Sequence, residues 1–445
     1  MLTEFHIGID DTDSRTGGCT THTAALLYQE LLDHGYRATD FPWLVRLNPN
    51  IPWKTRGNGA LAIHLAIEEA EIDSARDSAV RIVEETSDIS KPSTDPALVF
   101  LAGPVPDILR EYSTRALHDV ISIREAKNVA KTAGASAHLL KGARGLIGSL
   151  AAIGAGLEGK DHTFEIIAYR TRENLGTPRR VDKESVKRMN SEYAGRTFGN
   201  LDPETGRILI CPHGPDPVLL GIRGRDPRSV LEAFRKVKIS ETVERVIVFK
   251  TNQGTDAHLT KARSITELET HQSAVLTGRV ETVPQVLRGG HVVFRLRDET
   301  GLIDCAVYEP TGSLNLNARE LLPGDRVRVY GGIRSRVHGS LTLNLERLDV
   351  VGLTEAFRVE NPRCPECDGR CESMGRGQGF RCKKCRLRLP SVLKDMVTVE
   401  RNLTPAIFIP PPRARRHLTK PHSGIGSVPQ AAGLIARLVQ SEKTE

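Results

Sequence analysis

Two pairs of cysteines near the C-terminal end constrain the fold of this chain more than any other feature of its sequence. Cys364-x-x-Cys367 and Cys382-x-x-Cys385 are separated by fourteen residues. Each pair turns two sulfurs to one side, so the two pairs can surround one tetrahedral zinc ion. Because four thiolates leave no coordination position open, the sequence predicts a structural Zn²⁺ site in a zinc ribbon. The alternatives are that Cys371 replaces one ligand, or that the four cysteines are free.

Cysteine usage also indicates the compartment. The chain has 445 residues and eight cysteines, five of which lie between Cys364 and Cys385. A cluster of this kind is typical of metal binding in a reducing compartment rather than of a disulfide scaffold. Residues 1–9 lack the pattern of a signal peptide, and the weakly polar stretch Leu146–Leu157 is shorter than the roughly 20 residues that span a bilayer. We therefore expect a soluble, cytoplasmic protein with no membrane association.

The hydrophobic pattern predicts a multidomain α+β protein. Residues 1–160 alternate short apolar strands with segments at helical spacing, which predicts an α/β domain. Residues 161–266 predict a ferredoxin-like domain with helices and strands in alternation. Its helices are expected at Ser185–Met189 and Ser229–Val237, and its strands at Thr163–Tyr169, Arg207–Ile210, Val218–Ile222 and Val246–Lys250.

The C-terminal part of the chain changes to a pattern that suits nucleic acid. Residues 267–356 contain five short alternating runs separated by turns, as in a five-stranded OB-fold barrel, which commonly binds oligonucleotides. The zinc ribbon follows at 357–395 and a basic tail at 396–445. Nine basic and three acidic residues lie between positions 361 and 394, and the net charge is +7. Such a surface can bind phosphates, although it could also be a solvated basic face.

An acidic segment near the N-terminus is the strongest candidate for catalysis. Three carboxylates follow the first predicted strand, then two glycines and two threonines at the start of a helix: Asp10, Asp11, Asp13, Gly17, Gly18, Thr20 and Thr21. Adjacent carboxylates repel one another unless a cation joins them, and Mg²⁺ with a phosphate is the usual solution. A helix start also favours phosphate oxygens. Thr20 is then either a helix cap or a hydroxyl facing phosphate; the alternative is an acidic turn before a capped helix.

Two other segments combine basic side chains with glycine-rich backbone. Residues 54–59 contain Arg56, and residues 141–145 contain Lys141 and Arg144 just before a predicted helix. Flexible backbone beside cations suits phosphate groups, so we predict that these three side chains contact phosphate. Each segment alone could equally be an ordinary turn.

Taken together, six segments resemble one family, the archaeal tRNA(Ile) 2-agmatinylcytidine synthetases, also called agmatidine synthases. They are Gly8–Ser14 with Cys19–Thr21, Gly142–Gly148, Ile166–Arg170, Asn174–Arg179, Cys211–Asp216 and Thr251–Asp256. The order of a kinase-like domain, a ferredoxin-like domain, an OB-fold and a zinc ribbon also matches, so the resemblance extends over nearly the whole chain.

The resemblance implies an ATP-dependent ligase that acts on RNA. In this family ATP is cleaved to AMP and phosphates, and the C2 oxygen of the first anticodon cytidine is phosphorylated. The amine of agmatine then displaces phosphate, so that the tRNA reads AUA. The expected partners are agmatine and tRNA(Ile) with a CAU anticodon, and no obligate protein partner is inferred. The OB-fold, ribbon and basic tail would hold the tRNA.

The resemblance also suggests roles for particular residues. Asp10, Asp11 and Asp13 match the family's metal-binding acidic motif, and Thr20 matches its autophosphorylated threonine, with Thr21 as the neighbouring alternative hydroxyl. The guanidinium of agmatine calls for a bidentate carboxylate. Two aspartates in family-like loops, Asp216 and Asp256, are the candidates.

Two other functions are compatible with parts of the sequence. A non-enzymatic protein that binds single-stranded nucleic acid would use the OB-fold and the zinc ribbon, but it leaves the acidic segment and residues 1–266 unexplained. A metal-dependent nuclease would use Asp10 and Asp11 to cut RNA with Mg²⁺ and without ATP.

Overall fold

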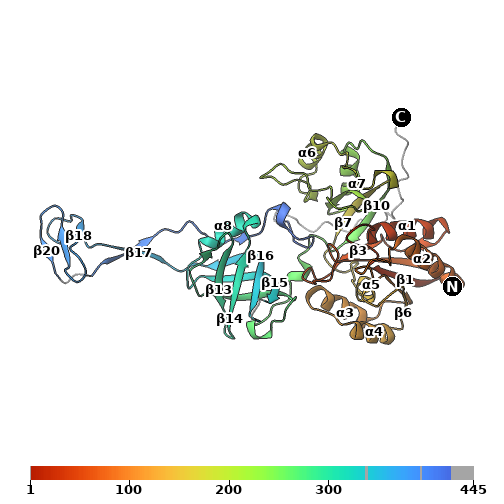
Figure 1. Cartoon of the computed structure of the whole chain (residues 1–445), viewed down its shortest axis with the longest axis horizontal. Coiled ribbons are helices and arrows are strands. Elements are labelled where there is room, and N and C mark those ends of the chain that lie inside the picture. The colour runs from red at the N-terminus through yellow and green to blue at the C-terminus, as the bar shows by residue number, and fades with distance from the viewer. Residues whose placement is uncertain (1, 336–338, 391–392, 422–445) are drawn as a thin grey trace.

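The computed structural model describes residues 2–335, 339–390 and 393–421, so the predicted basic tail is described only up to residue 421. The molecule is elongated, with the N-terminal and ferredoxin-like domains at one end, the OB-fold next to them and the zinc ribbon at the far end (Figure 1). This is the predicted multidomain α+β architecture. No helix in the described part of the chain is both long and apolar enough to cross a membrane.

One continuous sheet joins the two N-terminal domains. Within the described residues it has ten strands in the order β6-β5-β1-β4-β3-β10-β7-β9-β8, with β2 paired to β4. β1 is antiparallel to both β4 and β5, whereas β3 and β10 run parallel. The strands are β1 (Leu2–Asp10), β2 (Arg37–Ala38), β3 (Trp43–Arg46), β4 (Gly59–Glu68), β5 (Ala97–Ala102), β6 (Ser136–Leu139), β7 (Thr163–Arg170), β8 (Thr197–Phe198), β9 (Val218–Gly224) and β10 (Val243–Thr251).

Helices cover both faces of the N-terminal half of this sheet. Alternate residues of a strand point to opposite faces, so Ile63 of β4 packs in one core and Ala62 packs in the other. The first core contains α1 (Thr20–Asp33) and α2 (Ile72–Thr86). The second contains α3 (Asp107–His118), α4 (Ile123–Thr132) and α5 (Gly145–Ile153).

Helix α5 lies very close to β1 because glycines occupy the points of contact. A Cβ atom on Gly8 would come within 3.0 Å of the carbonyl oxygen of Ser149, and one on Gly148 would come within 3.0 Å of the Asp10 carboxylate. The Ser149 hydroxyl also donates to the carbonyl oxygen of Ala97 on β5, at 2.9 Å. The segments 8–14 and 142–148 therefore meet in space, and the first turn of α5 lies against the acidic segment.

The ferredoxin-like domain packs α6 (Lys183–Glu192) and α7 (Pro227–Lys236) on its part of the sheet. The strand predicted at Arg207–Ile210 is wrong, because this segment forms only an isolated bridge between Leu201 and Ile208. The short strand β8 takes the place beside β9. Ile208 and Ile210 still pack on the domain core, which explains why their apolar pattern resembled a strand.

A buried ion pair fixes the loops of this domain. The side chains of Arg170 and Glu241 are 1% and 0% exposed, and their closest nitrogen and oxygen are 2.6 Å apart. Arg170 also donates to the carbonyl oxygen of Thr177, at 2.8 Å. Arg179 donates to the carbonyl oxygens of Val218 and Gly214, at 2.7 and 3.0 Å. These contacts hold residues 174–179 against the loop that ends at residue 216.

Residues 273–352 form the predicted barrel. The pairing β11-β15-β16-β14-β13-β12 is closed by a contact between β11 and β13. Apolar residues such as Phe294, Leu296 and Val329 alternate along the strands and fill the interior. The elements are β11 (Ser273–Val280), β12 (Gln285–Val286), β13 (Val292–Arg297), β14 (Leu302–Val307), α8 (Ser313–Arg319), β15 (Arg326–Ser335) and β16 (Leu341–Gly352).

The zinc ribbon stands away from the barrel on a two-stranded stalk (Figure 1). The stalk pairs β17 (Ala356–Glu360) with β21 (Asp395–Val399). The ribbon is a three-stranded sheet of β18 (Cys371–Ser373), β19 (Phe380–Cys382) and β20 (Arg388–Leu389). Its small core consists largely of cysteines, so the fold depends on what those sulfurs bind.

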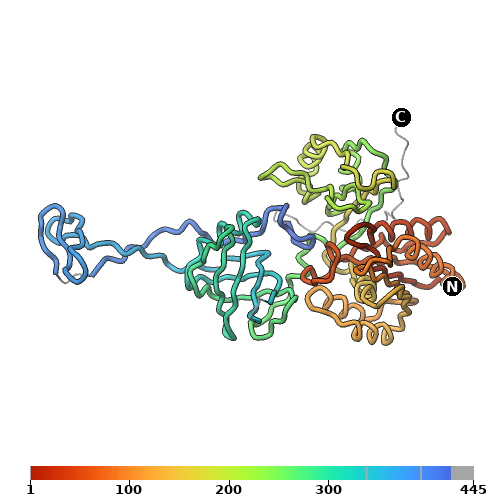
Figure 2. Tube along the Cα trace, viewed as in Figure 1, coloured from red at the N-terminus to blue at the C-terminus, as the bar shows by residue number. Residues whose placement is uncertain are grey.

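After the ribbon the chain returns to the rest of the molecule (Figure 2). β22 (Ile407–Phe408) pairs with β16, and residues 409–421, here called the C-terminal strap, continue to the N-terminal domains. The strap's basic side chains meet carboxylates of this protein: Arg413 pairs with Asp202 at 3.0 Å, and Arg416 pairs with Glu346 at 2.8 Å. The strap therefore ties the ferredoxin-like domain and the OB-fold together.

We predict that Gly8→Ala lowers the free energy of unfolding by about 1–3 kcal/mol, because the new methyl group would overlap the backbone of α5. Gly159→Ala is the matched control, since no atom lies within 4 Å of the position of its Cβ. Urea unfolding measures both. Equal stability of the two variants would contradict the close packing of α5 on β1.

Candidate active site

A cavity of about 360 Å³ lies where the acidic segment, the start of α5, the ferredoxin-like domain and the strap meet. Eight of the residues predicted from the sequence line it: Asp10, Asp11, Asp13, Thr20, Thr21, Arg56, Arg144 and Asp216. These residues come from four segments that are far apart in the chain. The fold therefore brings most of the predicted site together in one cavity.

Asp10 and Asp11 form the acidic wall of the cavity. The backbone N–H of Asp11 donates to Oδ1 of Asp10 at 2.7 Å, and Asp11 adopts a left-handed backbone with φ of 59°. Burial, together with the charge of Asp11, raises the pKa of Asp10 well above its usual range. Burial also raises the pKa of Asp11 to about 7, although Arg144 opposes the shift. Both carboxylates are thus held where a cation would favour their charged forms.

Arg144 connects the acidic segment to the loop before α5. Its Nε donates to Oδ2 of Asp11 at 2.9 Å, and its Nη2 donates to the carbonyl oxygen of Ser93 at 2.6 Å. Asp95 accepts hydrogen bonds from the backbone N–H groups of Gly142 and Arg144, at 2.6 and 3.0 Å. The loop before α5 is therefore held by Asp95, a residue that the sequence did not point to.

Arg56 joins the N-terminal domain to the ferredoxin-like domain across the cavity. Its Nε lies 3.3 Å from Oδ2 of Asp13, and its Nη1 lies 3.3 Å from Oδ2 of Asp216. Its Nη2 also donates to the carbonyl oxygen of Gly18 at 2.7 Å. Burial raises the pKa of Asp13, and the charge of Arg56 opposes this effect. One guanidinium thus fixes both the glycine turn and an aspartate of the second domain.

The two threonines begin α1 and differ in their hydrogen bonds. The N-cap of α1 is Cys19, and its side chain makes no capping hydrogen bond, so Thr20 is the first helical residue rather than the cap. The Thr20 hydroxyl accepts a hydrogen bond from the Thr12 hydroxyl at 3.1 Å. The Thr21 hydroxyl lies 3.0 Å from Sγ of Cys19. Both threonines line the cavity.

The structure places four predicted residues outside the cavity lining. Lys141 donates to the carbonyl oxygen of Lys91 at 2.9 Å. Asp256 accepts from the backbone N–H of Lys420 at 2.7 Å and lies near Arg347. Gly17 and Gly18 face the cavity only indirectly, through their carbonyl oxygens and Arg56.

The cavity residues that the sequence did not point to include Arg46, Glu165, Arg223 and His417. Glu165 lies within the apolar strand β7, where it accepts a hydrogen bond from Nε of Arg223 at 3.0 Å. A single carboxylate within the apolar run Phe164–Tyr169 was a signal in the sequence that could have been used. His417 comes from the strap and gave no signal, because only the tertiary fold returns it to the cavity.

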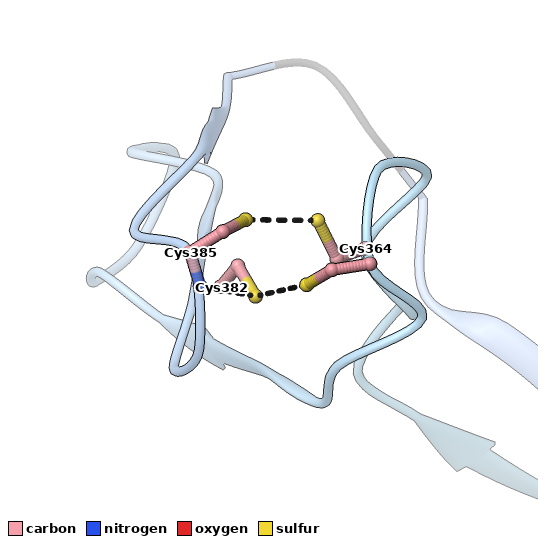
Figure 3. Close-up of side chains that lie close together, drawn as sticks. Cys364, Cys382 and Cys385 are labelled. Carbon is pink, nitrogen blue, oxygen red and sulfur yellow. Dashed lines mark hydrogen bonds between the residues drawn. The ribbon is translucent and has the colours of Figure 1, made fainter.

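The four predicted zinc ligands converge as a second, separate site. Sγ of Cys364 lies 3.4 Å from Sγ of Cys385, Sγ of Cys367 lies 3.5 Å from Sγ of Cys382, and all four lie within 4.8 Å of one another. Figure 3 shows the sulfurs of Cys364, Cys382 and Cys385 pointing toward one another. Tetrahedral thiolates at the Zn–S bond length are about 3.8 Å apart, so this donor set fits zinc.

Cys371 stays outside this ligand set. Its Sγ lies 4.0 Å from the carbonyl oxygen of Gly369. Backbone N–H groups of Cys385 and Lys384 lower the pKa of Cys382 to about 6, which favours its thiolate.

Among the described residues, no other group of three or more His, Cys, Asp or Glu side chains converges in this way. The three aspartates of the acidic segment are therefore not a preassembled three-carboxylate cage.

Comparison with known proteins finds matches along nearly the whole chain. Family models match in the order TiaS TCKD domain (residues 6–142), TiaS FLD domain (143–258), OB-fold nucleic acid binding domain (274–351) and TiaS C-terminal zinc ribbon domain (361–403). The isoleucine tRNA 2-agmatinylcytidine synthetase TiaS of Pyrococcus horikoshii is 43% identical, over 94% of this chain and 96% of its own length. This chain belongs to the TiaS family.

Other TiaS proteins agree in sequence and in fold. The Methanosarcina mazei TiaS is 44% identical over 93% of this chain and 96% of its own length. A solved complex of TiaS with its isoleucine tRNA and ATP has a TM-score of 0.84 at 37% identity, and it covers 96% of this chain and 99% of that one. A TiaS complex with the same tRNA, AMPCPP and agmatine has a TM-score of 0.82 at 36% identity, with the same coverage. The resemblance drawn from six short segments is thereby confirmed at the level of the family.

We predict that Cys382→Ser removes the zinc of this TiaS family member, because a hydroxyl cannot replace a thiolate in a four-sulfur site. Cys371→Ser is the matched control and should retain about one zinc per chain. Metal content after dialysis, measured by inductively coupled plasma mass spectrometry, tests both. Equal zinc loss in the two variants would contradict the assigned ligand set.

Proposed function

We propose that this chain uses ATP to attach agmatine to C2 of the wobble cytidine of tRNA(Ile) with a CAU anticodon, so that the tRNA decodes AUA. The main support is that relatives 43–44% identical along nearly their whole length are isoleucine tRNA 2-agmatinylcytidine synthetases. A TiaS of the same fold has been solved with its isoleucine tRNA, AMPCPP and agmatine. The cavity adds buried carboxylates and guanidinium groups suited to phosphoryl transfer.

The proposed chemistry has two steps. A C2 oxygen leaves poorly, so phosphorylation first converts it into a phosphate ester, while ATP is consumed to AMP and phosphates. The agmatine nitrogen then bonds to C2, the C2–O bond breaks, and phosphate departs with the original oxygen. Phosphoryl transfer needs mainly positioning and neutralisation of charge, which a cavity of fixed ionic side chains supplies.

Asp10, Asp11 and Asp13 are the proposed Mg²⁺ ligands. Their support is the burial that raises the pKa of all three, since such carboxylates gain most from a bound cation. Mg²⁺ usually takes only one or two carboxylates and completes its shell with water and substrate phosphates. When bound there, Mg²⁺ would neutralise phosphate charge.

Arg56 and Arg144 are the proposed phosphate contacts, and Thr20 is the proposed phosphorylated hydroxyl, because all three line the cavity beside the aspartates. Lys141 has less support, since its ammonium binds backbone carbonyl oxygens. The proposed catalytic unit is residues 1–160, because α5 packs on β1.

Asp216 is the better supported of the two candidate agmatine ligands. It lines the cavity, and its carboxylate already binds the guanidinium groups of Arg56 and Arg179, the chemistry that agmatine requires. Asp256 lies outside the lining and accepts from the backbone of Lys420. The target cytidine must leave its base stack to reach this space. A tRNA substrate supports a cytoplasmic location for the protein.

The direct test is ATP-dependent incorporation of labelled agmatine into unmodified tRNA(Ile) with a CAU anticodon, beside a methionine tRNA. We predict that only the isoleucine tRNA is labelled, and that Asp11→Asn lowers the rate at least roughly 100-fold while tRNA binding persists. Asp73→Asn is the control, because that carboxylate is 90% exposed on α2. Binding of the tRNA without any label would favour a binding protein, and shortening of the RNA without ATP would favour a nuclease.

A further inference from the structure

The C-terminal strap holds His417 in the cavity, because the residues before and after it in the chain are both anchored. On one side, Arg416 donates to Glu346 of the OB-fold at 2.8 Å and to the carbonyl oxygen of Pro49 at 3.3 Å. On the other side, Leu418 is 2% exposed, and its carbonyl oxygen accepts from the backbone N–H of Asp256 at 2.8 Å. His417, between these anchors, is therefore held in place.

The imidazole of His417 presents a hydrogen-bond donor to the cavity. Nη2 of Arg223 lies 3.1 Å from Nδ1 of His417, so Nδ1 accepts and Nε2 carries the proton. His417 is an exposed residue, and it lines the cavity. The charge of Arg46, together with desolvation and the charge of Arg223, lowers the pKa of His417 well below its usual range. The ring is thus a neutral donor.

Arg46 converges on the same space. A Cβ atom on Gly57 would lie 2.6 Å from Nη1 of Arg46 and 3.1 Å from Nε2 of His417. The absence of a side chain at Gly57 therefore leaves room for both groups to meet. Gly57 directly follows Arg56, so this meeting point adjoins the guanidinium that binds Asp13 and Asp216.

The Arg46 guanidinium lacks a direct counter-ion. Within the described residues, the Arg46 guanidinium has no ion pair or hydrogen bond, and its Nε is buried without a partner. The nearby carboxylate, Glu165, already accepts from Arg223 and from Gln253. Arg46 and Arg223 thus share one adjacent carboxylate, and the other carboxylate that acts on Arg46, Asp13, is paired with Arg56. A buried cation without a partner is costly, so an anion in the cavity would relieve it.

We propose that Arg46, Arg223 and the strap residue His417 form a phosphate-binding subsite of the cavity, which makes the C-terminal strap part of the active site. The inference rests on the proposed function, because it assigns one part of the same cavity. The phosphate can come from the polyphosphate of ATP or from the RNA backbone beside the target cytidine. Guanidinium forks and a neutral N–H donor suit either source.

Binding measurements on the full-length chain test this subsite without requiring agmatine transfer. The variants are Arg46→Gln, His417→Ala and His417→Gln, with Lys420→Ala as control, because the Lys420 ammonium pairs with Asp161 on the surface. Affinities are measured separately for ATP without tRNA and for tRNA(Ile) without ATP, beside the thermal midpoint of each variant. The glutamine at position 417 retains an N–H donor.

We expect Arg46→Gln and His417→Ala to weaken binding of one ligand roughly tenfold or more at an unchanged thermal midpoint, as for loss of a hydrogen bond to a charged group. His417→Gln should restore most of the affinity. Weaker ATP binding assigns the subsite to the nucleotide, and weaker tRNA binding assigns it to RNA phosphate. Affinities for both ligands within twofold of the unmodified chain, or a loss that only follows a lower thermal midpoint, would overturn the proposal. A chain that binds ATP through Arg46 yet attaches no agmatine would instead overturn the proposed function.

Discussion

Helix α5 can lie directly on strand β1 because Gly8 and Gly148 occupy the contact positions, and the acidic segment takes its place from that contact. The Asp10 carboxylate lies where a side chain on Gly148 would be, so the start of the helix and the end of the strand share one wall of the cavity. Arg144, just before α5, then reaches Asp11. Without this close approach the aspartates would remain an exposed turn, and burial would not raise the pKa of Asp10 and Asp11.

The same cavity depends on segments from the whole length of the chain. Arg56 joins Asp13 to Asp216, so the glycine turn of one domain is held by a loop of the next. The strap lines a further side of the cavity, after the chain has passed through the OB-fold and the distant ribbon. The parts expected to hold RNA and the parts expected to do chemistry are thus separated in space but linked by one continuous return segment.

The sequence predicted what depends on local spacing. Two Cys-x-x-Cys turns specify their sulfurs within a few residues, and alternating runs specify the barrel strands, so both were found. The acidic segment was found because its carboxylates are adjacent. The pairing of strands could not be predicted from local sequence. β1 has antiparallel neighbours on both sides, and Ile208 packs on the domain core without belonging to a strand. Arg46 and His417 were missed because they are about 370 residues apart in the chain and come together only in the folded structure.

The proposed mechanism requires that the C2 oxygen of the wobble cytidine leaves as phosphate. It can be tested with a tRNA(Ile) that carries ¹⁸O at that position, by mass spectrometry of the inorganic phosphate released as agmatine is joined. We expect one ¹⁸O atom in phosphate for each agmatine attached. Phosphate at natural isotopic abundance, released while agmatine is still incorporated, would contradict a phosphorylated cytidine and with it the role given to the cavity.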